Sequence, residues 1–474
     1  MRLIPIYTWN RELHSMKLSR TNFKNQPWAA GAILLLCVIV AMLIANIPFT
    51  SHIYHSILET KLSITITNSR FGTTTLPKDM NVEKFINDIL MVVFFFTVGL
   101  EIKREVICGE LSSVKKAMLP VIAAAGGMAA PALIYSAFNI GTSTAGGWGI
   151  PTATDIAFAM GIMSILGNKV PVSLKIFLTA LAIADDLGAI LVVALFYGGK
   201  INFALLVIAM VILALIWVIN RLGEKRPMFY LVPAIAVWFL FYYSGIHSTM
   251  SGVVMAFMIP MEARYPRQCL RRNMNKYIKR IIRYDEDAFE SGTNFPNSPQ
   301  RHCLRRMSHV TNNSIGMSYR LEHALTPFVN FGIMPIFALA NAGVEIPDLS
   351  FFNIFQPLPF DGVGFASLGV FLGLLLGKPV GITIASYIAI KCKVGAMPQG
   401  ASWKMLFAVA CLGGIGFTMS IFVDTLSFGE LPKEQMAMLQ ASGKIAVLLG
   451  SLCAGVLGSL LINAFHKLES KGKA

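Results

Sequence analysis

The chain has 474 residues, of which 55% are hydrophobic and only 14% are charged. Soluble domains carry roughly 25% charged residues, so a soluble protein of this length could not cover its surface, and lipid must surround most of the chain. The composition therefore argues against a nucleic-acid-binding protein, despite a net charge of +15. The seven cysteines form no C-x-x-C pair and favour neither a disulfide framework nor a zinc site.

Twelve apolar segments are long enough to cross a bilayer, because about 20 helical residues span the ~30 Å hydrocarbon core. The first follows a basic stretch that could mimic a secretory signal. The apolar run of this first segment is too long for a signal peptide, and further membrane spans follow it. We therefore expect an uncleaved transmembrane helix. The chain is therefore predicted to be an all-α polytopic membrane protein. The predicted helices cover roughly 28–48, 83–106, 117–138, 149–167, 171–197, 202–220, 227–244, 246–261, 324–343, 364–389, 405–427 and 440–465.

The distribution of Lys and Arg predicts the orientation. With the N-terminus inside, the inner segments hold 29 of these residues and the outer loops hold 5. Positively charged loops stay cytoplasmic, so we expect both termini in the cytoplasm. The predicted regions are a tail (1–27), helices one to eight (28–261), a basic cytoplasmic loop (262–320), helices nine to twelve (321–465) and a second tail (466–474).

Two loops have patterns of their own. Residues 62–76, outside the membrane, alternate and then turn, which is typical of a small β-hairpin. Inside, the stretch 264–283 is strongly basic with interleaved apolar residues. We interpret it as a solvated loop or as a helix resting on anionic lipid headgroups, and we expect no nucleic-acid site beside a membrane domain.

Helix five carries two neighbouring acids, Asp185 and Asp186, with apolar residues for over a turn on both sides. Asp185 lies about 20 Å into the helix at 1.5 Å per residue, which is near mid-membrane. A charge there costs ~2.5 to 3.5 kcal/mol on insertion scales and marks a functional site. Because successive residues point about 100° apart, one acid could meet a cation while the other lines a watery cavity.

Lys378, about midway along helix ten, is the obvious partner for one of these acids. A lone buried ammonium would lose its proton or pair with a carboxylate. The alternative, an ion pair that merely ties two helices together, accounts for one Asp and leaves the other unexplained. The spacing G-x-x-x-G-K over 373–378, followed by Pro379, does not match a phosphate-binding loop, so an ATP-driven pump is disfavoured.

Two helices carry residues that should interrupt them. Helix four has Pro151, Thr152, Thr154 and Asp155 within a short span, and helix eleven has the stretch 413–418, GGIGFT. The alternatives are a proline in the first helical turn and glycines that allow close helix packing. Non-helical backbone within the membrane is stable only where it is buried in protein or lines a cavity. Two such breaks therefore indicate a functional site. Asp155 and Lys378 have the charges that would compensate the half-helix ends.

The two breaks occupy similar positions in the chain. Helices three to five and ten to twelve each form a triplet with an interrupted middle member, and the two triplets enter the membrane from opposite sides. Inverted repeats of this kind are typical of secondary transporters, whose site lies at the repeat interface.

At these residues the chain resembles the NhaA family of sodium/proton antiporters, a family that is itself a known example of inverted repeats. The similarity spans most of the helical region. The matching stretches are 94–105, 147–162, 175–197, 245–254, 320–343, 372–382 and 413–422.

The resemblance implies roles for the transport site. Asp185 and Asp186 would be the carboxylates that exchange cation and proton, and Lys378 would pair with Asp185. Asp155 and Thr154 would stabilise the crossed chains near the site. The family's outer hairpin implies a homodimer, and its members imply a multi-pass protein of the bacterial inner membrane.

The resemblance also implies pH regulation at the cytoplasmic end of helix two. Glu101, Arg104, Glu105 and Glu322 match that region, and His247 is a further candidate. His247 and Asp88 fall at family motif positions, although a single His near a helix end is more commonly structural. Three departures from the family are the length of the 262–320 loop, the extended N-terminal tail and an additional acid, Asp424.

These features predict a secondary Na⁺(Li⁺)/H⁺ antiporter that exports sodium, with no cofactor and no enzymatic activity. Small hard cations prefer oxygen ligands, so protons and metal compete for the oxygens of Asp185 and Asp186. Two acids that release protons against one monovalent cation would make transport electrogenic. Because acidification would protonate the site, we expect activity to rise with alkalinity.

Three other functions are considered. A symporter for an organic substrate would require a larger polar or aromatic lining than these helices supply. A membrane enzyme or redox subunit would require paired His ligands or a nucleophile with its base, whereas the eight His are scattered. A passive channel would show flux without coupling between sodium and protons.

Overall fold

The structure is a computed structural model. It describes residues 27–62, 64–68, 72–76, 80–199, 201–263, 265, 267–289, 297–346, 364–429 and 431–471. Predicted features in the tail 1–27 lie outside the described residues, apart from its last residue.

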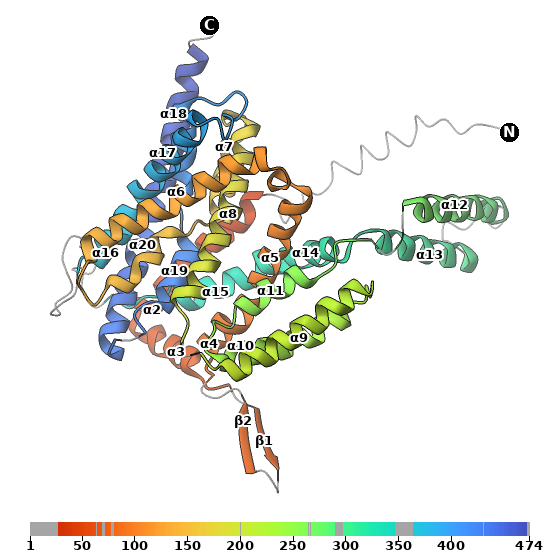
Figure 1. Ribbon diagram of the computed structural model, residues 1–474, viewed down its shortest axis with the longest axis horizontal. Helices are drawn as coiled ribbons and strands as arrows, with labels where there is room; N and C mark the ends of the chain where they lie inside the picture. Colours follow the sequence, from red (N-terminus) through yellow and green to blue (C-terminus); the bar gives the residue numbers. More distant parts are fainter. Residues whose placement is uncertain are drawn as a thin grey trace.

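The described part of the chain is built from helices, as predicted, with one small sheet (Figure 1). Several helices are continued by a turn of 3₁₀ or π-helix, named η. The elements of the first half are α2 (Pro27–Asn46), α3 (Pro48–Glu59), β1 (Ile64–Asn68), β2 (Gly72–Leu76), α4 (Val82–Phe85), η2 (Ile86–Leu90), α5 (Met91–Cys108), η3 (Glu110–Ser112), α6 (Val114–Asn139), η4 (Ala145–Thr152), α7 (Ile156–Leu166), η5 (Gly167–Lys169), α8 (Val172–Phe196) and α9 (Phe203–Arg221).

All elements in the described residues of the second half are helices. Its elements are α10 (Met228–Ser244), α11 (Met250–Met258), α12 (Arg267–Phe289), α13 (Ser298–Ser314), α14 (Met317–Phe328), η6 (Val329–Ile333), α15 (Met334–Asn341), α16 (Ala366–Leu372), η8 (Gly373–Gly377), α17 (Lys378–Lys391), α18 (Trp403–Gly413), α19 (Phe417–Leu426) and α20 (Lys433–Lys471).

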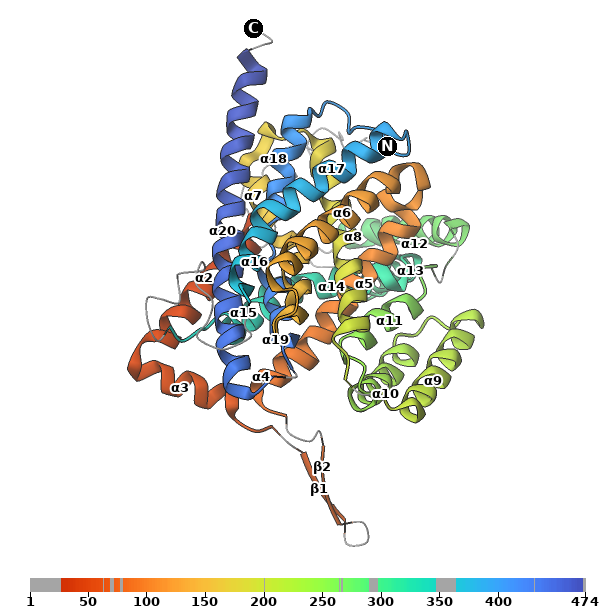
Figure 2. The same cartoon turned by 60° about the vertical axis from the view of Figure 1, so that its left-hand side comes forward.

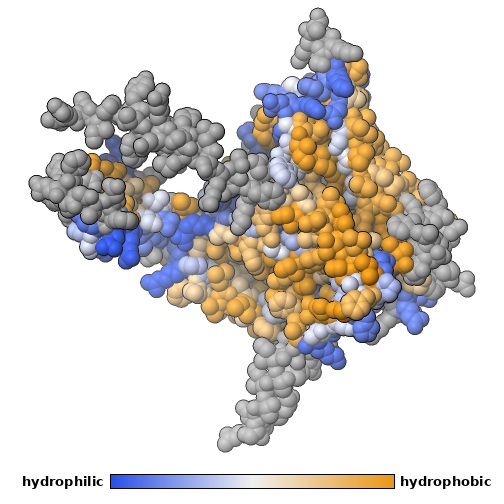
Figure 3. All heavy atoms as spheres, turned by 180° about the vertical axis from the view of Figure 1, so that it is seen from behind, coloured by the Kyte–Doolittle hydropathy of each residue, from blue (hydrophilic) through white to orange (hydrophobic). Residues whose placement is uncertain are grey.

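The helices have the length and surface of a membrane domain. Within the described ranges, nine helical segments are long and apolar enough to cross a bilayer, and the bent pair α18 and α19 could make a tenth crossing. Large apolar side chains such as Leu36, Val207 and Leu215 are exposed on the outside of the bundle. Figure 3 shows a broad hydrophobic surface over the body of the molecule. This surface fits a polytopic membrane protein, while the number of twelve crossings stays a prediction.

One predicted crossing is shorter than expected. We predicted a helix over 246–261, but α11 covers only Met250–Met258. Nine residues rise about 14 Å, which is less than the hydrocarbon core. Residues 247–249 form tight backbone turns that lead into the helix, and Pro260 follows it.

The stretch expected to form a hairpin does so. Strands β1 and β2 pair antiparallel, with Ile64 opposite Leu76 and Asn68 opposite Gly72. In Figures 1 and 2 this hairpin projects from the body, away from the end where the C-terminus lies.

Close contact between α6 and α17 positions the centre of the fold. A Cβ atom added to Gly126 would lie 2.6 Å from the carbonyl oxygen of Gly381, so the two backbones touch. Small residues allow such close helix packing in membranes. Figure 2 shows α6 beside α16 and α17, with α20 running along the same group. This contact fixes the start of α17, where Lys378 stands.

Candidate functional site

The two predicted central residues, Asp185 and Lys378, form a buried ion pair. Asp185 comes from the middle of α8 and Lys378 from the first position of α17, and neither side chain is exposed to solvent. The Lys378 ammonium contacts the Oδ2 atom of Asp185 and also donates to the hydroxyl of Thr154. The Thr154 Oγ1 atom lies 2.6 Å from the same Asp185 oxygen. Three segments that are distant in sequence therefore meet at one carboxylate oxygen.

Asp186 is buried beside this pair but is not part of it. Its side chain is 3% exposed. Its Oδ1 atom, like the Oδ1 atom of Asp185, has no hydrogen-bond partner among the described residues. A buried carboxylate oxygen without a donor is costly, because nothing replaces the water that it has lost. Each of these two oxygens would be stabilised by a proton or a small cation.

The first chain break lies directly before α7. The 3₁₀ segment η4 contains Pro151 and ends at Thr152, and the backbone is extended from Ala153 to Asp155. Proline removes a backbone donor, and an extended segment leaves its polar groups free for partners elsewhere. The interruption predicted for helix four is confirmed, and it turns Thr154 toward Asp185.

The second break separates α18 from α19. Residues Gly414, Ile415 and Gly416 lie between the two helices, which are bent by 46°. A Cβ atom on Gly416 would lie 2.8 Å from the carbonyl oxygen of Ala153, so the two breaks pass each other in close contact. The interruption predicted for helix eleven is therefore also confirmed, and glycine is needed where the chains cross.

Asp155 joins the two breaks. Its Oδ1 atom accepts from the backbone N–H of Phe158 at 3.3 Å, which makes it the N-cap of α7. Its Oδ2 atom accepts from the hydroxyl of Thr418 at 2.5 Å and from the backbone N–H of Thr418 at 3.2 Å. Its own N–H donates to the carbonyl of Ile415 at 2.6 Å. Both carboxylate oxygens of Asp155 therefore have hydrogen-bond donors.

The charges near the crossing compensate the ends of the half-helices. A helix N-terminus carries a partial positive charge and a C-terminus a partial negative charge. Asp155 stands at the N-termini of α7 and α19. The hydroxyl of Thr154, which accepts from Lys378, lies 2.9 Å from the carbonyl of Gly413 at the end of α18. Lys378 thus lies near the negative C-terminus of α18, and Asp155 lies at the positive N-termini of α7 and α19.

The helix that carries Lys378 is itself irregular. The π-helical turn η8 covers Gly373–Gly377 and ends directly before Lys378. A π-turn widens the helix by one residue and is common at functional sites. At this turn, the Cβ position of Gly377 would lie 2.9 Å from the Cα atom of Pro131 in α6. The turn and this contact together set the direction of the lysine.

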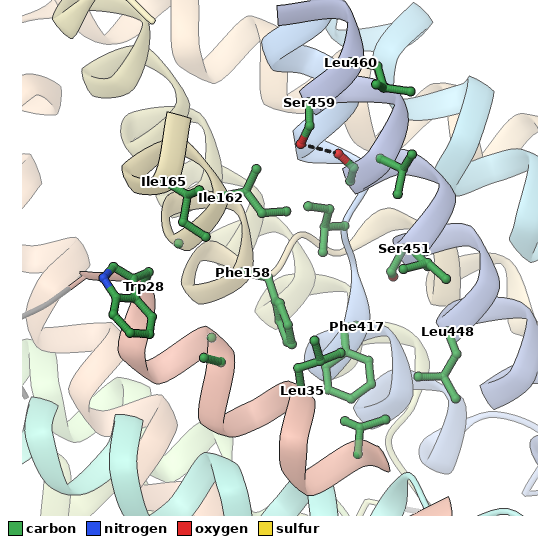
Figure 4. A pocket seen from close by; sticks show the side chains of 18 residues that line it. Trp28, Leu35, Phe158, Ile162, Ile165, Phe417, Leu448, Ser451, Ser459 and Leu460 are labelled. Carbon is green, nitrogen blue, oxygen red and sulfur yellow. Dashed lines mark hydrogen bonds between the residues drawn. The ribbon is translucent and has the colours of Figure 1, made fainter. Parts of the chain in front are cut away.

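An apolar pocket of about 480 Å³ borders the crossing (Figure 4). The aromatic rings of Phe158 and Phe417, which follow the two breaks, both line it and meet edge to face, with centroids 5.3 Å apart. Trp28 and Ile165 line it farther out. Its lining contains serine hydroxyls but no acidic side chain, so this pocket does not offer a cation the ligands that the Asp185 and Asp186 region does.

The four residues expected to regulate transport lie together at the end of α5 and in α14. The guanidinium of Arg104 contacts Glu322 at 2.5 Å, Glu105 at 2.9 Å and Glu101 at 3.9 Å. The Arg104 and Glu101 side chains are both 34% exposed, so this network is accessible to water. One cation shared by three carboxylates makes a group whose total charge depends on pH.

His247 lies apart from this network. It stands between α10 and α11, where its Nδ1 atom is 2.7 Å from the Thr249 hydroxyl and its ring meets the edge of Phe422. Asp88, in η2 before α5, accepts from the hydroxyl of the neighbouring Ser248 at 2.8 Å. These two residues therefore belong to the opposite end of α5, and the structure does not bring them to Arg104.

The sequence did not point to one contact of the site or to the burial of one further acid. It did not single out Thr418 as the partner of Asp155, although a threonine directly after a predicted break is a donor near a helix N-terminus. It flagged Asp424 only as a departure from the family. Asp424 is fully buried in α19, and neither of its oxygens has a hydrogen-bond partner in the described part of the chain.

Comparison with known proteins agrees with this geometry. The family model described as Na⁺/H⁺ antiporter 1 matches residues 21–462. The Na(+)/H(+) antiporter NhaA of Oleidesulfovibrio alaskensis is 40% identical and the match covers 94% of each chain. The NhaA proteins of Pelagibacter ubique and Helicobacter pylori are 41% and 39% identical, over 92% and 96% of this chain and 94% and 97% of their own lengths. With ionisable groups buried where two broken helices cross and relatives aligned over nearly its whole length, the chain belongs to the NhaA family of Na⁺/H⁺ antiporters.

Proposed function

We propose that this antiporter exports Na⁺ or Li⁺ in exchange for protons at the paired carboxylates Asp185 and Asp186. The observation that carries the proposal is that the buried Oδ1 atoms of Asp185 and Asp186 have no hydrogen-bond partner in the part of the chain that the structure describes, while Lys378 already binds Asp185. A proton or a small hard cation would satisfy these oxygens. Both ligands need the same atoms, so binding of one expels the other.

Lys378 gives the exchange its charge balance. In the structure its ammonium holds one oxygen of Asp185, while the other carboxylate oxygens of Asp185 and Asp186 form no ion pair among the described residues. A metal ion that binds Asp185 would compete with this ammonium. If two protons enter for each sodium that leaves, one net charge moves per cycle, and the membrane potential contributes ~2.3 kcal/mol per charge per 100 mV.

Alternating access would use the crossing. Asp155 ties α7 to α19, so the two half-helices would shift as a unit and turn the acids toward one side and then the other. In the proposed orientation both termini face the cytoplasm of a bacterium and the site exports sodium across the inner membrane. The β1–β2 hairpin would join two copies into a dimer.

The Arg104 network is proposed to regulate this cycle by pH. Glu101, Glu105 and Glu322 share one guanidinium, so protonation of any of them changes the balance of attraction and repulsion between α5 and α14. Acid would also protonate the transport site itself. Activity should therefore rise from mildly acidic to mildly alkaline pH, and a flat profile would contradict this.

The central experiment is sodium-induced dequenching of a pH-sensitive dye in everted membrane vesicles. Asp186→Asn should abolish the response, because the amide keeps the shape of the side chain but cannot exchange a proton. Equal membrane levels and thermal stability of the variant would show that the loss is not a folding defect. A response equal to that of the wild type would refute the assignment of Asp186.

The charge balance is tested separately in reconstituted vesicles with an imposed potential. An interior-negative or interior-positive potassium diffusion potential should change sodium flux in opposite directions. Flux that is indifferent to the potential would refute electrogenic exchange while leaving the antiport assignment intact.

A further inference from the structure

The two helices of the long basic loop form an arm beside the membrane domain. Figure 1 shows α12 and α13 side by side, reaching outward from the region where α11 ends and α14 begins. In Figure 1 the arm extends across the direction of α20, which is one of the long apolar helices. An arm with this direction runs along the membrane plane and not away from it.

The base of the arm lies at the membrane domain, and the two chain segments at this base contact each other. Only Ile315 and Gly316 separate α13 from α14, and a Cβ atom on Gly316 would lie 2.0 Å from the carbonyl oxygen of Met261. On the other side, Tyr265 donates its N–H to the carbonyl of Asn313 at 3.1 Å. The arm therefore starts at the level where α14 enters the membrane.

The inner faces of the two helices pack on each other. Cys303 and Val310 of α13 are buried, and Met274 of α12 lies next to Thr311. Asn297 caps α13 through a capping box with Gln300. These contacts explain the helical structure of a segment that has little apolar content, and they leave the outer faces of the arm free.

A basic stripe runs along the outer face of α12. Arg272, Lys276, Lys279 and Arg283 follow one another at intervals of four, three and four residues, and all four side chains are exposed. This spacing puts them on one side of the helix. The acidic residues of α12 are confined to its last turns, at 285–287, and the sequence of α13 contains no acid.

Next to this stripe the arm exposes apolar side chains. Ile278 and Ile282, four residues apart on α12, are 43% and 56% exposed, and Leu304 of α13 is 45% exposed. From the helical positions of the packed faces, Leu304 lies on the same side of the antiparallel pair as the two isoleucines. Water around the arm would not favour exposed apolar side chains beside the basic stripe. Helices that rest on a membrane have apolar residues on one side and Lys or Arg beside them.

We propose that the α12–α13 arm lies on the bilayer and binds the headgroups of anionic phospholipids. The phosphates would meet the stripe of Arg272, Lys276, Lys279 and Arg283, while Ile278, Ile282 and Leu304 enter the boundary with the acyl chains. The side of the membrane is the one that the distribution of Lys and Arg assigns to the cytoplasm. Basic residues are attracted to an anionic surface, so the four together favour the bound arm.

Two labelled variants test the position of the arm. The full-length protein, with its seven native cysteines replaced by alanine, is reconstituted and labelled with an environment-sensitive fluorophore at Ile278→Cys or at Arg280→Cys. The two positions are two residues apart but about 200° apart around the helix. In vesicles that contain phosphatidylglycerol, the label at 278 should shift to the blue, and the label at 280 should report water. Equal emission from both positions would overturn the proposal.

The charge requirement is tested with a matched pair of variants. Replacing Arg272, Lys276, Lys279 and Arg283 by Gln should abolish the blue shift at 278, and high salt should weaken it in the parent protein. Replacing Arg280, Arg301, Arg305 and Arg306 by Gln removes the same charge elsewhere on the arm and should preserve most of the shift. Retained sodium transport and elution as a single species show that each variant is folded.

Two changes to the vesicles show whether the arm binds lipid or a second copy of the protein. One changes the lipid composition, and the other dilutes the protein in the membrane. In vesicles of phosphatidylcholine alone the shift should be much smaller than with phosphatidylglycerol. A shift of equal size in neutral vesicles would overturn the role of charge. A shift that disappears when the protein is diluted at constant lipid composition would assign the surface to another copy and overturn the lipid proposal.

Discussion

One oxygen of Asp155 accepts two hydrogen bonds from Thr418, one from its hydroxyl at 2.5 Å and one from its backbone N–H at 3.2 Å. The two residues are 263 positions apart in sequence and stand at the starts of different half-helices. The other Asp155 oxygen caps α7, so this one carboxylate joins the N-terminus of α7 to the N-terminus of α19. Variants of the residues around it separate structural roles from transport roles.

Replacing Thr418 by valine removes the hydroxyl donor and keeps the shape of the side chain. Thr418→Val should lower the thermal stability in detergent by about 0.6–2 kcal/mol, the range for polar contacts between membrane helices. Thr418→Ser keeps the donor and should retain most of the stability. The variants are compared by thermal unfolding, and a valine variant as stable as the wild type would show that this bond contributes little.

Removing Lys378 alone should be more harmful than removing the whole ion pair. Lys378→Met leaves the Asp185 carboxylate buried without its cation, and breaking a buried pair in this way costs about 3–5 kcal/mol. Adding Asp185→Asn removes the stranded charge, so the double variant should be more stable than Lys378→Met. Thermal unfolding of the two single variants and the double variant gives the coupling, and additive losses would argue against a direct pair.

Arg104→Gln should move the pH profile of transport toward more alkaline values. Without the guanidinium, Glu101, Glu105 and Glu322 face one another, and like charges make ionisation of all three less favourable. Arg104→Lys keeps the charge and should stay closer to the wild-type profile. The check is the rate of sodium-dependent proton movement measured from mildly acidic to alkaline pH. An acid shift in the Gln variant would contradict this role.

Gly126→Ala should disturb the α6–α17 contact. The added Cβ would lie 2.3 Å from the Cβ atom of Ala385 and 2.6 Å from the Gly381 carbonyl oxygen, so α17 must move. Overpacking of this kind costs about 1–3 kcal/mol. Because Lys378 begins α17, the apparent KM for sodium should also rise. Gly146→Ala adds a Cβ that meets no described atom within 4 Å and serves as the control. Equal stability of the two variants would refute the contact.

Much of the site follows from residue chemistry alone. Charged residues in an apolar helix can be recognised from the sequence alone, and so can clusters of glycine, proline and threonine. The free-energy cost of a charge or of a broken helix in lipid does not depend on the rest of the fold. The sequence thus indicates Asp185, Asp186, Lys378 and both helix breaks. It does not indicate that Asp155 uses both of its oxygens structurally, since the donor from Thr418 comes from the distant α19.

The sequence by itself determined that the chain lies in a membrane, where the ionisable residues stand and where helices must break, because hydropathy and backbone chemistry are local properties. Only the tertiary structure decided which oxygen meets Lys378, that His247 lies away from Arg104, that α11 is short and that α12 and α13 form an arm. These features depend on the rotation of each helix about its axis and on contacts between distant segments. A local pattern carries no information about either.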